Sequence, residues 1–317
     1  MIKKLLKSIL RIIFQHPLNY LLKKNKILII FRRGSALGDH IYMSSIIRKI
    51  DEKGKYKIIL FSNHYEFYLN NPRIYRLIKI KQKNLVWSFL NLLKSEMILE
   101  FVSTYNIRNN KHFLFQHPKK NIHLAQSMSN HFNLDLDYKN LQNEIFFSQN
   151  EAEQYEKRIN LPNKFALIHS SAKSTYTKNK EWSLEGIQDI VNYFDTKNWI
   201  QLGTSKEPKL QNCQILFDLN IRKVAYVLSK CEFIVCYEGF FNHLASCFNK
   251  KTFVIHTGFL PIESFKYKNN IIIENNKNLS CYPCYDLICE NHKKRVLENL
   301  RTEFVLQKIK KNLENSL

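Results

Sequence analysis

The chain has little glycine and proline, with seven of each among its 317 residues. This scarcity argues against a chain rich in linkers or low-complexity segments. Acidic residues are also scarce, because 27 Asp and Glu stand against 49 Lys and Arg, and none of the acids precedes Asp39. The net charge of +22 favours a polyanionic partner, whether nucleic acid, anionic lipid or a phosphorylated sugar.

Long apolar runs and a regular cysteine framework are missing as well. No run of apolar residues reaches the roughly 18–20 that a membrane-spanning helix needs. The seven cysteines are odd in number, and several lie in or beside apolar runs, where a free cysteine behaves as a small apolar side chain. A secreted disulfide framework is therefore disfavoured, and we expect a reducing compartment, the cytoplasm.

The chain does contain enough apolar material for two cores, since 44% of its residues are hydrophobic and 13% aromatic. Short apolar runs alternate with helical patterns, which predicts an α/β fold of two Rossmann-like domains with parallel sheets and helices on both faces. Strands are expected at 26–31, 57–61, 96–101, 165–169, 199–202, 233–237, 252–256 and 271–274. A charged stretch at 148–161 marks the boundary, so we expect domains at 26–155 and 156–317.

Residues 1–25 form a segment of a different kind. Apolar residues share one face of a helix here, whereas the basic residues lie elsewhere on it; the apolar ones are Leu5, Leu6, Ile9, Ile12 and Ile13. A basic amphipathic helix of this type can lie in the interface of an anionic membrane. A surface helix that packs on the domain by its apolar face is the alternative. A signal peptide is disfavoured, because charges break the apolar run and no small-residue cleavage site follows.

The turn after the first expected strand carries glycines and the first carboxylate of the chain, in the order Gly34-Ser35-Ala36-Leu37-Gly38-Asp39. A helical pattern follows, so Asp39 is expected where a strand ends and a helix begins. Helix N–H groups favour an ionised carboxylate there, and such a group can take a proton from an acceptor hydroxyl. A plain helix N-cap is the alternative interpretation of Asp39.

Two stretches of the second domain also combine strand ends with polar residues. The first runs from His169-Ser170-Ser171 to Lys178-Asn179-Lys180-Glu181-Trp182-Ser183, with Ser183 as the expected N-cap of a helix over 183–194. The second reads Tyr237-Glu238-Gly239-Phe240-Phe241-Asn242-His243-Leu244-Ala245. A lysine and a histidine in such positions can serve a ligand site, because ligands bind at the carboxyl ends of the strands in this architecture. The alternatives are a solvated loop lysine and a buried histidine that serves packing.

These three stretches, in this order, resemble the motifs of the heptosyltransferases of glycosyltransferase family 9. The resemblance covers most of the chain from about Lys26 onward, although the middle of the first domain maps poorly. It implies a GT-B fold, in which two Rossmann-like domains face each other across a cleft. It also implies that Asp39 is the catalytic base and that Gly34 and Gly38 are the turn glycines on the acceptor side.

The resemblance further implies a donor-binding site on the second domain, with Lys180 as the phosphate-binding lysine. The other residues that map onto this site are Ser170, Ser171, Glu238, Gly239, Phe240 and His243. The chain departs from the family pattern at four positions: Glu238 replaces an aspartate, Gly239 a hydroxyl residue, Phe240 a glycine and Ser183 a proline. The bulk of Phe240 beside the phosphate loop puts the identity of the donor in question.

The function that the resemblance implies is an inverting transfer of heptose or a related sugar. The donor would be a nucleotide sugar such as ADP-heptose, and the acceptor a lipopolysaccharide core or another lipid-linked or phosphorylated glycan. The enzyme would work in the cytoplasm, bound peripherally to the inner face of the membrane. No metal or other cofactor is expected for the reaction, because Lys180 and helix N–H groups can stabilise the diphosphate.

Three alternatives stay open. A cysteine cluster with the spacing of a zinc site is formed by Cys281, Cys284, Cys289 and His292, although reduced loop thiols are the favoured explanation. A catalytically inactive relative that binds sugar is compatible with Phe240. A basic nucleic-acid-binding protein is compatible with the charge, but we find none of the sequence motifs of such proteins, and no nucleic-acid partner is expected.

Overall fold

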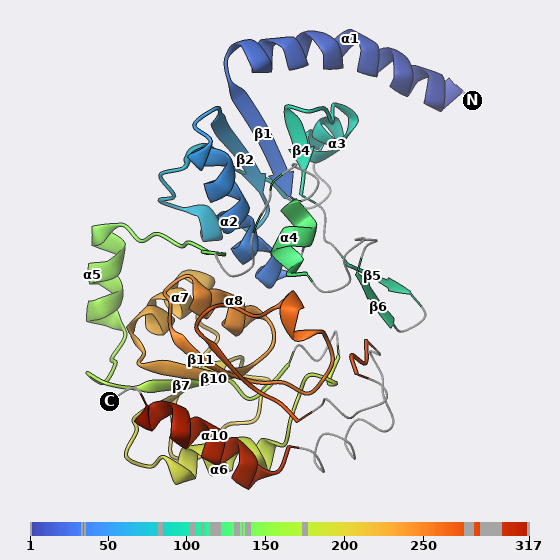
Figure 1. The fold of residues 1–317 in the computed structure, drawn as a ribbon. Coiled ribbons are helices and arrows are strands. Elements are labelled where there is room, and N and C mark those ends of the chain that lie inside the picture. The colour runs from blue at the N-terminus through green and yellow to red at the C-terminus, as the bar shows by residue number, and fades with distance from the viewer. Residues whose placement is uncertain are drawn as a thin grey trace.

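The computed structural model describes residues 2–32, 34, 36–81, 85–101, 105–108, 111–114, 122–129, 134, 136, 141–172, 177–275, 282–285 and 300–315 (Figure 1). The first half contains α1 (Ile2–Lys24), β1 (Ile27–Arg32), α2 (Leu37–Glu52), β2 (Lys57–Ser62), η1 (Tyr65–Tyr68), β3 (Ile74–Lys79), α3 (Leu85–Leu92), β4 (Ile98–Glu100), β5 (Tyr105–Arg108), β6 (Lys111–Leu114) and α4 (Leu124–Ser129). Helix α5 (Gln149–Arg158) follows. The second half contains β7 (Ala166–Ile168), α6 (Leu184–Tyr193), β8 (Trp199–Gly203), β9 (Gln214–Phe217), α7 (Ile221–Lys230), β10 (Phe233–Tyr237), α8 (Phe240–Ser246), β11 (Lys251–Ile255), η4 (Ile262–Ser264), β12 (Asn270–Ile273) and α10 (Thr302–Glu314).

The first half is built on a parallel sheet with the strand order β3-β2-β1-β4. Alternate residues of β1 serve opposite faces, as the two-residue period of a strand requires. Leu28 and Ile30 pack in the cluster that contains the apolar face of α2. Phe31 packs on the other face with Leu22 of α1 and Leu90 of α3. Strands β5 and β6 form a separate antiparallel hairpin.

The second half has a six-stranded parallel sheet with the order β12-β11-β10-β7-β8-β9. Helices α7 and α8 lie on the face toward the first half, and α6 and α10 lie on the other face (Figure 1). Residues of β7 alternate in the same way, since Leu167 packs toward α7 and α8 whereas Ile168 packs toward α6 and α10. Ser183 caps α6, because its hydroxyl accepts a hydrogen bond from the backbone N–H of Gly186.

The predicted α/β fold with parallel sheets is confirmed, and each strand predicted from the sequence is present with its ends moved by at most two residues. The strand at 233–237 has the predicted ends. The sequence analysis missed β3, β9, the β5–β6 hairpin and α5. None of the helices in the described part of the chain has the length and apolar content to cross a membrane.

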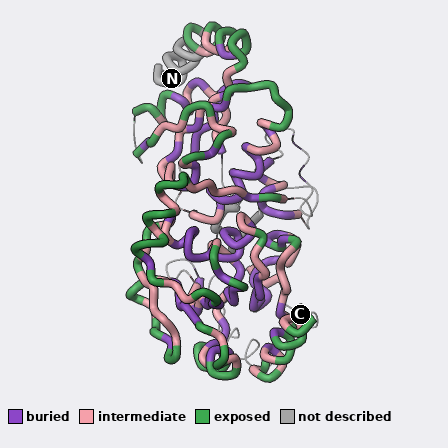
Figure 2. The backbone as a smooth tube through the Cα atoms, turned by 90° about the vertical axis from the view of Figure 1, so that its left-hand side faces the viewer, coloured by how far each residue is buried: buried purple, intermediate pink, exposed green. Residues whose placement is uncertain are grey.

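The two halves pack directly against each other. The cluster of buried apolar residues that begins under β1 and α2 continues into α7, α8 and the second sheet, and Figure 2 shows buried segments in both halves and between them. Arg222 of α7 adds polar contacts between segments that are distant in the sequence. Its guanidinium donates to the Glu66 carbonyl of η1 at 3.2 Å, to the Phe146 carbonyl at 2.5 Å and to the Glu151 carboxylate of α5 at 2.6 and 2.8 Å.

Candidate active site

Each sheet has a point where the strand order reverses, and the candidate residues lie at these two points. In the first sheet the chain leaves β1 for α2 and β2 on one side, whereas β4 lies on the other side of β1. In the second sheet β7 and β10 are neighbours from which the chain proceeds in opposite directions. Open α/β sheets bind ligands beyond the carboxyl ends of strands at such positions. Asp39 follows β1, Ser170 and Ser171 follow β7, and Glu238 follows β10.

Asp39 lies in the first turn of α2 and is only 2% exposed. Its Oδ2 accepts a hydrogen bond from Nη2 of Arg32 at 2.6 Å, and its Oδ1 accepts one from the Tyr42 hydroxyl at 2.6 Å. Arg32 also donates to the Phe101 carbonyl after β4 at 3.3 Å, so it spans the reversal point of the first sheet. The N-cap of α2 is Ala36. The alternative interpretation of Asp39 as an N-cap is therefore wrong.

The glycines of this turn are needed for close approach. A Cβ on Gly34 would lie 2.8 Å from Nη2 of Arg32, which would disturb the Arg32–Asp39 ion pair. A Cβ on Gly38 would lie 2.7 Å from Cδ2 of His243 in α8, a separation that real Cβ atoms do not show. Gly38 therefore brings the turn of the first half against the helix of the second half, and Asp39 lies next to this contact.

His243 is fully enclosed where the two halves meet. Its Nδ1 lies 2.8 Å from the Tyr267 hydroxyl, and its ring lies edge-on to the ring of Tyr42 at 5.0 Å. Burial lowers the pKa of His243 well below its ordinary value, and the nearby His123 and Lys180 add to this effect. The ring is therefore neutral at physiological pH. Its contribution is shape and hydrogen bonding, and the positive charge of the site comes from Lys180.

Lys180 belongs to a buried charged group at the carboxyl edge of the second sheet. Its Nζ lies 3.2 Å from Oε1 of Glu238 and 5.0 Å from the centre of the Phe259 ring. Oε2 of Glu238 lies 3.2 Å from Nδ1 of His256, which follows β11. Burial raises the pKa of Glu238, but Lys180 and His256 outweigh it, and the net pKa lies below its ordinary value. Glu238 is thus an ionised carboxylate only 4% exposed, and it holds Lys180 in place.

The remaining candidates lie around the same edge. The hydroxyl of Ser170 is buried and accepts a hydrogen bond from Gln201 of β8 at 3.0 Å, whereas Ser171 is half-buried. Gly239 precedes α8 with φ of 143°, a backbone region that glycine alone adopts without strain. This backbone explains why glycine stands at that position. Phe240 begins α8 and packs edge-on against Phe67 of the first half at 6.4 Å.

The structure therefore places the described candidates at or beside the carboxyl ends of strands in the two sheets. It places Asp39, Gly34 and Gly38 on the first half, and the donor-side residues on the second. It also shows that Lys180 is not a solvated loop lysine. The roles of these residues stay predictions. The sequence analysis missed Arg32, Tyr42 and His256; the signal that could have found Arg32 and His256 is a basic or titratable residue directly at the end of a buried apolar run.

The cysteine cluster falls mainly outside the described residues. Cys281, Cys289 and His292 lie there, whereas Cys284 is half-buried and its backbone N–H donates to the Gly258 carbonyl at 2.9 Å. Among the described residues, no group of three or more His, Cys, Asp or Glu side chains is arranged to hold a metal ion.

Comparison with known proteins connects this geometry to one family. The sequence description of "Glycosyltransferase family 9 (heptosyltransferase)" matches residues 99–295, which is more than half of the chain. The comparison with curated protein sequences gives no match.

Solved structures show a similar fold. The iron-containing dodecameric glycosyltransferase TibC from enterotoxigenic E. coli matches with a TM-score of 0.67 at 12% identity, over 92% of this chain and 77% of TibC. The E. coli ADP-heptose lps heptosyltransferase II matches with a TM-score of 0.57 at 14% identity, over 89% of this chain and 100% of the enzyme. The E. coli heptosyltransferase WaaC, solved with ADP, matches with a TM-score of 0.58 at 11% identity, over 90% of this chain and 100% of WaaC.

At these identities the structural likeness shows the fold, which is the GT-B arrangement of two facing Rossmann-like domains. The family match and the shared fold lead to one conclusion: this chain is a glycosyltransferase and belongs to glycosyltransferase family 9.

Proposed function

We propose that the protein transfers a heptose or related sugar from a nucleoside-diphosphate sugar to a cell-surface glycan, with inversion at the anomeric carbon. The observation that carries the proposal is the contact between Gly38 and His243. It brings the turn of Asp39, which can accept a proton, next to the helix that begins after Glu238, the partner of Lys180. A base and a cationic group for the leaving diphosphate are thus provided from opposite halves.

The reaction follows from these positions. An acceptor hydroxyl attacks the anomeric carbon and forms the new C–O bond while its proton passes to Asp39. The bond from the anomeric carbon to the diphosphate oxygen breaks, and the electron pair leaves with the nucleoside diphosphate. Lys180 stabilises the negative charge that develops on this oxygen, together with the N–H groups at the start of α8. A single displacement of this kind inverts the configuration of the anomeric carbon.

Features of the similar enzymes support the choice of donor. WaaC was solved with ADP, and TibC was solved with ADP-D-beta-D-heptose. We therefore propose an ADP-linked heptose as the first donor to examine. A phosphorylated or lipid-linked glycan acceptor, such as a lipopolysaccharide core, suits the net charge of +22. Because Lys180 can serve as counter-charge to the diphosphate, we propose that transfer does not require a metal ion.

Binding of the donor tests the second half of the site. Thermal unfolding of the purified protein is measured with ADP, UDP and GDP and with their sugar conjugates, for the wild type and for Lys180→Met. We expect stabilisation by one nucleotide family that is lost in Lys180→Met. Lys178→Met is the matched control, since Lys178 is exposed and lies two residues away. Equal losses in both variants, or no stabilisation of the wild type by any nucleotide, would contradict the donor site.

Turnover tests the first half. Release of the nucleoside diphosphate from the donor is followed with water as the acceptor and then with glycan fractions. Asp39→Asn should bind the donor as the wild type does but release nucleoside diphosphate at a rate lower by about 10²–10⁴, the usual contribution of a general base. Normal turnover by a folded Asp39→Asn would refute the assignment. Donor binding without turnover in the wild type would identify an inactive relative that binds sugar.

A further inference from the structure

One end of the molecule combines exposed apolar side chains with a cluster of lysines. This end is formed by α1, the turn between α2 and β2, and α3, and it lies away from the second half in both Figure 1 and Figure 2. Helix α1 is fixed to the body by its last turns. Leu22 is buried against Leu90 of α3, and Gln15 donates to the Lys94 carbonyl at 2.6 Å.

The outward sides of α1 and α3 are apolar. Ile13 and Phe14 of α1 are 56% and 50% exposed, and Leu85 and Phe89 of α3 are 85% and 52% exposed. Most large apolar side chains that the described chain exposes belong to these two helices. Helix α3 packs inward through Leu90, yet its opposite side is apolar too. Adjacent exposed apolar side chains of this kind mark an interaction surface.

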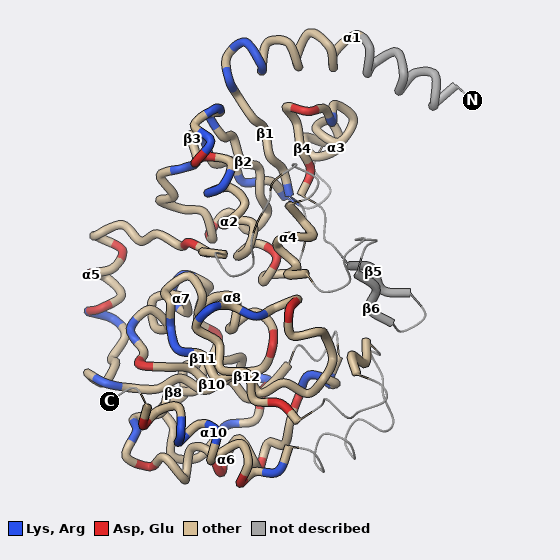
Figure 3. Tube along the Cα trace, viewed as in Figure 1, with Lys and Arg blue, Asp and Glu red and all other residues tan. Residues whose placement is uncertain are grey.

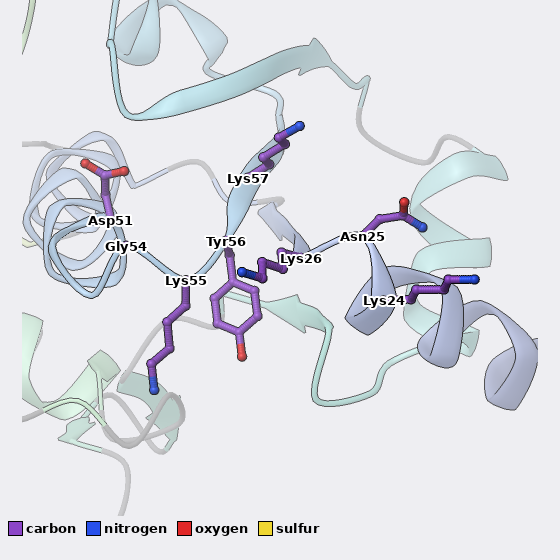
Figure 4. Close-up of a pocket in the computed structure, with 8 residues that line it drawn as sticks. All are labelled: Lys24, Asn25, Lys26, Asp51, Gly54, Lys55, Tyr56 and Lys57. Carbon is purple, nitrogen blue, oxygen red and sulfur yellow. The ribbon is translucent and has the colours of Figure 1, made fainter.

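Lysines surround a recess of about 410 Å³ beside this apolar surface (Figure 4). The recess lies where α1 ends and where β1 and β2 begin, and Tyr56 lines it. Its four lysines are all exposed: Lys24, Lys26, Lys55 and Lys57. The nearby carboxylate of Asp51 is already paired, since Arg73 lies 2.9 Å from it. Figure 3 shows the basic residues along this end of the chain.

We propose that this end, defined as the outward sides of α1 and α3 together with the lysine-lined recess, docks on an anionic lipid bilayer. Apolar side chains enter the interfacial layer while lysines attract the negative headgroups, which is the combination that peripheral helices use. A second copy of the chain is a poorer occupant. A two-fold contact places the same patch on both partners, and it would bring the same lysines face to face. The proposal goes beyond the proposed function and does not depend on it.

Sedimentation with vesicles tests the proposal. The purified full chain is mixed with vesicles of phosphatidylcholine alone or of phosphatidylcholine with phosphatidylglycerol. We expect binding to the anionic vesicles and weak binding to the neutral ones, with a loss at high salt. Each lysine near the surface contributes about a fivefold increase in affinity. Replacing all four recess lysines by Gln should therefore weaken binding by roughly 600-fold, nearly three orders of magnitude.

A control variant carries the same change in net charge on the second half, where four exposed lysines are replaced by Gln: Lys206, Lys209, Lys310 and Lys311. We expect this control to bind vesicles nearly as the wild type does. Phe14→Ser combined with Phe89→Ser should also weaken binding, because it removes the apolar contact. Circular dichroism and a cooperative thermal transition show that each variant is folded, and this control does not depend on the donor site.

Three results would overturn the proposal. Equal losses in the recess variant and the control variant would mean that net charge alone attracts the protein. An absence of binding to anionic vesicles would refute the docking surface outright. A concentration-dependent dimer that Phe14→Ser with Phe89→Ser dissociates, without any vesicle binding, would assign the surface to a second copy.

Discussion

The contact between Gly38 and His243 can be tested with the substitution Gly38→Ala, whose effect on stability should change sign when the His243 ring is removed. Gly38 lies within α2, where alanine is favoured over glycine by about 1 kcal/mol. If nothing lay near it, Gly38→Ala would therefore stabilise the protein. The structure places the new Cβ 2.7 Å from Cδ2 of His243, and crowding of this kind costs about 1–3 kcal/mol. We expect Gly38→Ala to leave the free energy of unfolding unchanged or to lower it by up to about 2 kcal/mol.

Removal of the His243 ring should restore the gain in stability that alanine gives over glycine in a helix. In a His243→Ala background, Gly38→Ala is expected to stabilise by about 1 kcal/mol, so that the coupling between the two sites is about 1–3 kcal/mol. The loss of the Tyr267 hydrogen bond appears in both His243→Ala proteins and cancels in the cycle. Urea unfolding of the four proteins gives the coupling, provided that fluorescence and circular dichroism show coincident transitions.

A zero coupling would refute the reasoning. If Gly38→Ala raised stability equally in both backgrounds, the ring of His243 would not lie against the turn of Asp39. The two halves would then not meet as described, and the proposed function would lose the observation on which it rests.

Two other predictions concern stability. Burial lowers the pKa of His40 to about 2 and the pKa values of His123 and His169 to about 3, from 6.5; between these values the unfolded chain binds protons that the folded protein does not. Stability should therefore fall as pH drops below about 6.5, by up to about 1.4 kcal/mol per pH unit for each histidine. Urea unfolding at several pH values measures how steeply the free energy of unfolding depends on pH, and this dependence should be shallower for His169→Gln. An unchanged dependence would contradict the assignment. Arg222→Met leaves the partly exposed Glu151 carboxylate and the Glu66 and Phe146 carbonyls without this guanidinium. It should destabilise the protein by about 2 kcal/mol, and a loss below about 0.5 kcal/mol in the same assay would contradict this.

The strand that the sequence predicted with both ends right is one whose burial is complete. Strand β10 is buried at every position and its apolar run begins and ends with the strand. The missed strands are at sheet edges: β9 is half-buried throughout, and β3 has three exposed positions. Arg76 and Lys79 interrupt the apolar pattern of β3, and the apolar run of β9 has only three residues, which is too short to identify a strand. Helix α5 was missed because it buries none of its residues, so that it carries no apolar period.

The residues of the candidate site also fall into two groups, those in local sequence motifs and those brought in by tertiary contacts. Asp39, Lys180 and Glu238 lie in short local motifs, which a single sequence displays. His256 acts on Glu238 from the end of the neighbouring strand β11, so its partner is set by the register of the sheet. Arg32 pairs with a residue seven positions later, but its second contact, to the Phe101 carbonyl, requires β4 beside β1. Contacts of this second kind depend on tertiary structure and leave no pattern in the sequence.

The two proposals together restrict the acceptor. The lysine-lined recess lies at the start of β1, whereas Asp39 lies beyond its end. Strand β1 has six residues, and at about 3.3 Å per residue it spans about 20 Å. With a bilayer against α1 and α3 and with Asp39 as the base, the reacting hydroxyl must stand on the order of 20 Å from the lipid surface. A sugar attached directly to a lipid headgroup does not reach that far, so the geometry favours an acceptor that already carries several sugars between its lipid anchor and the hydroxyl that reacts.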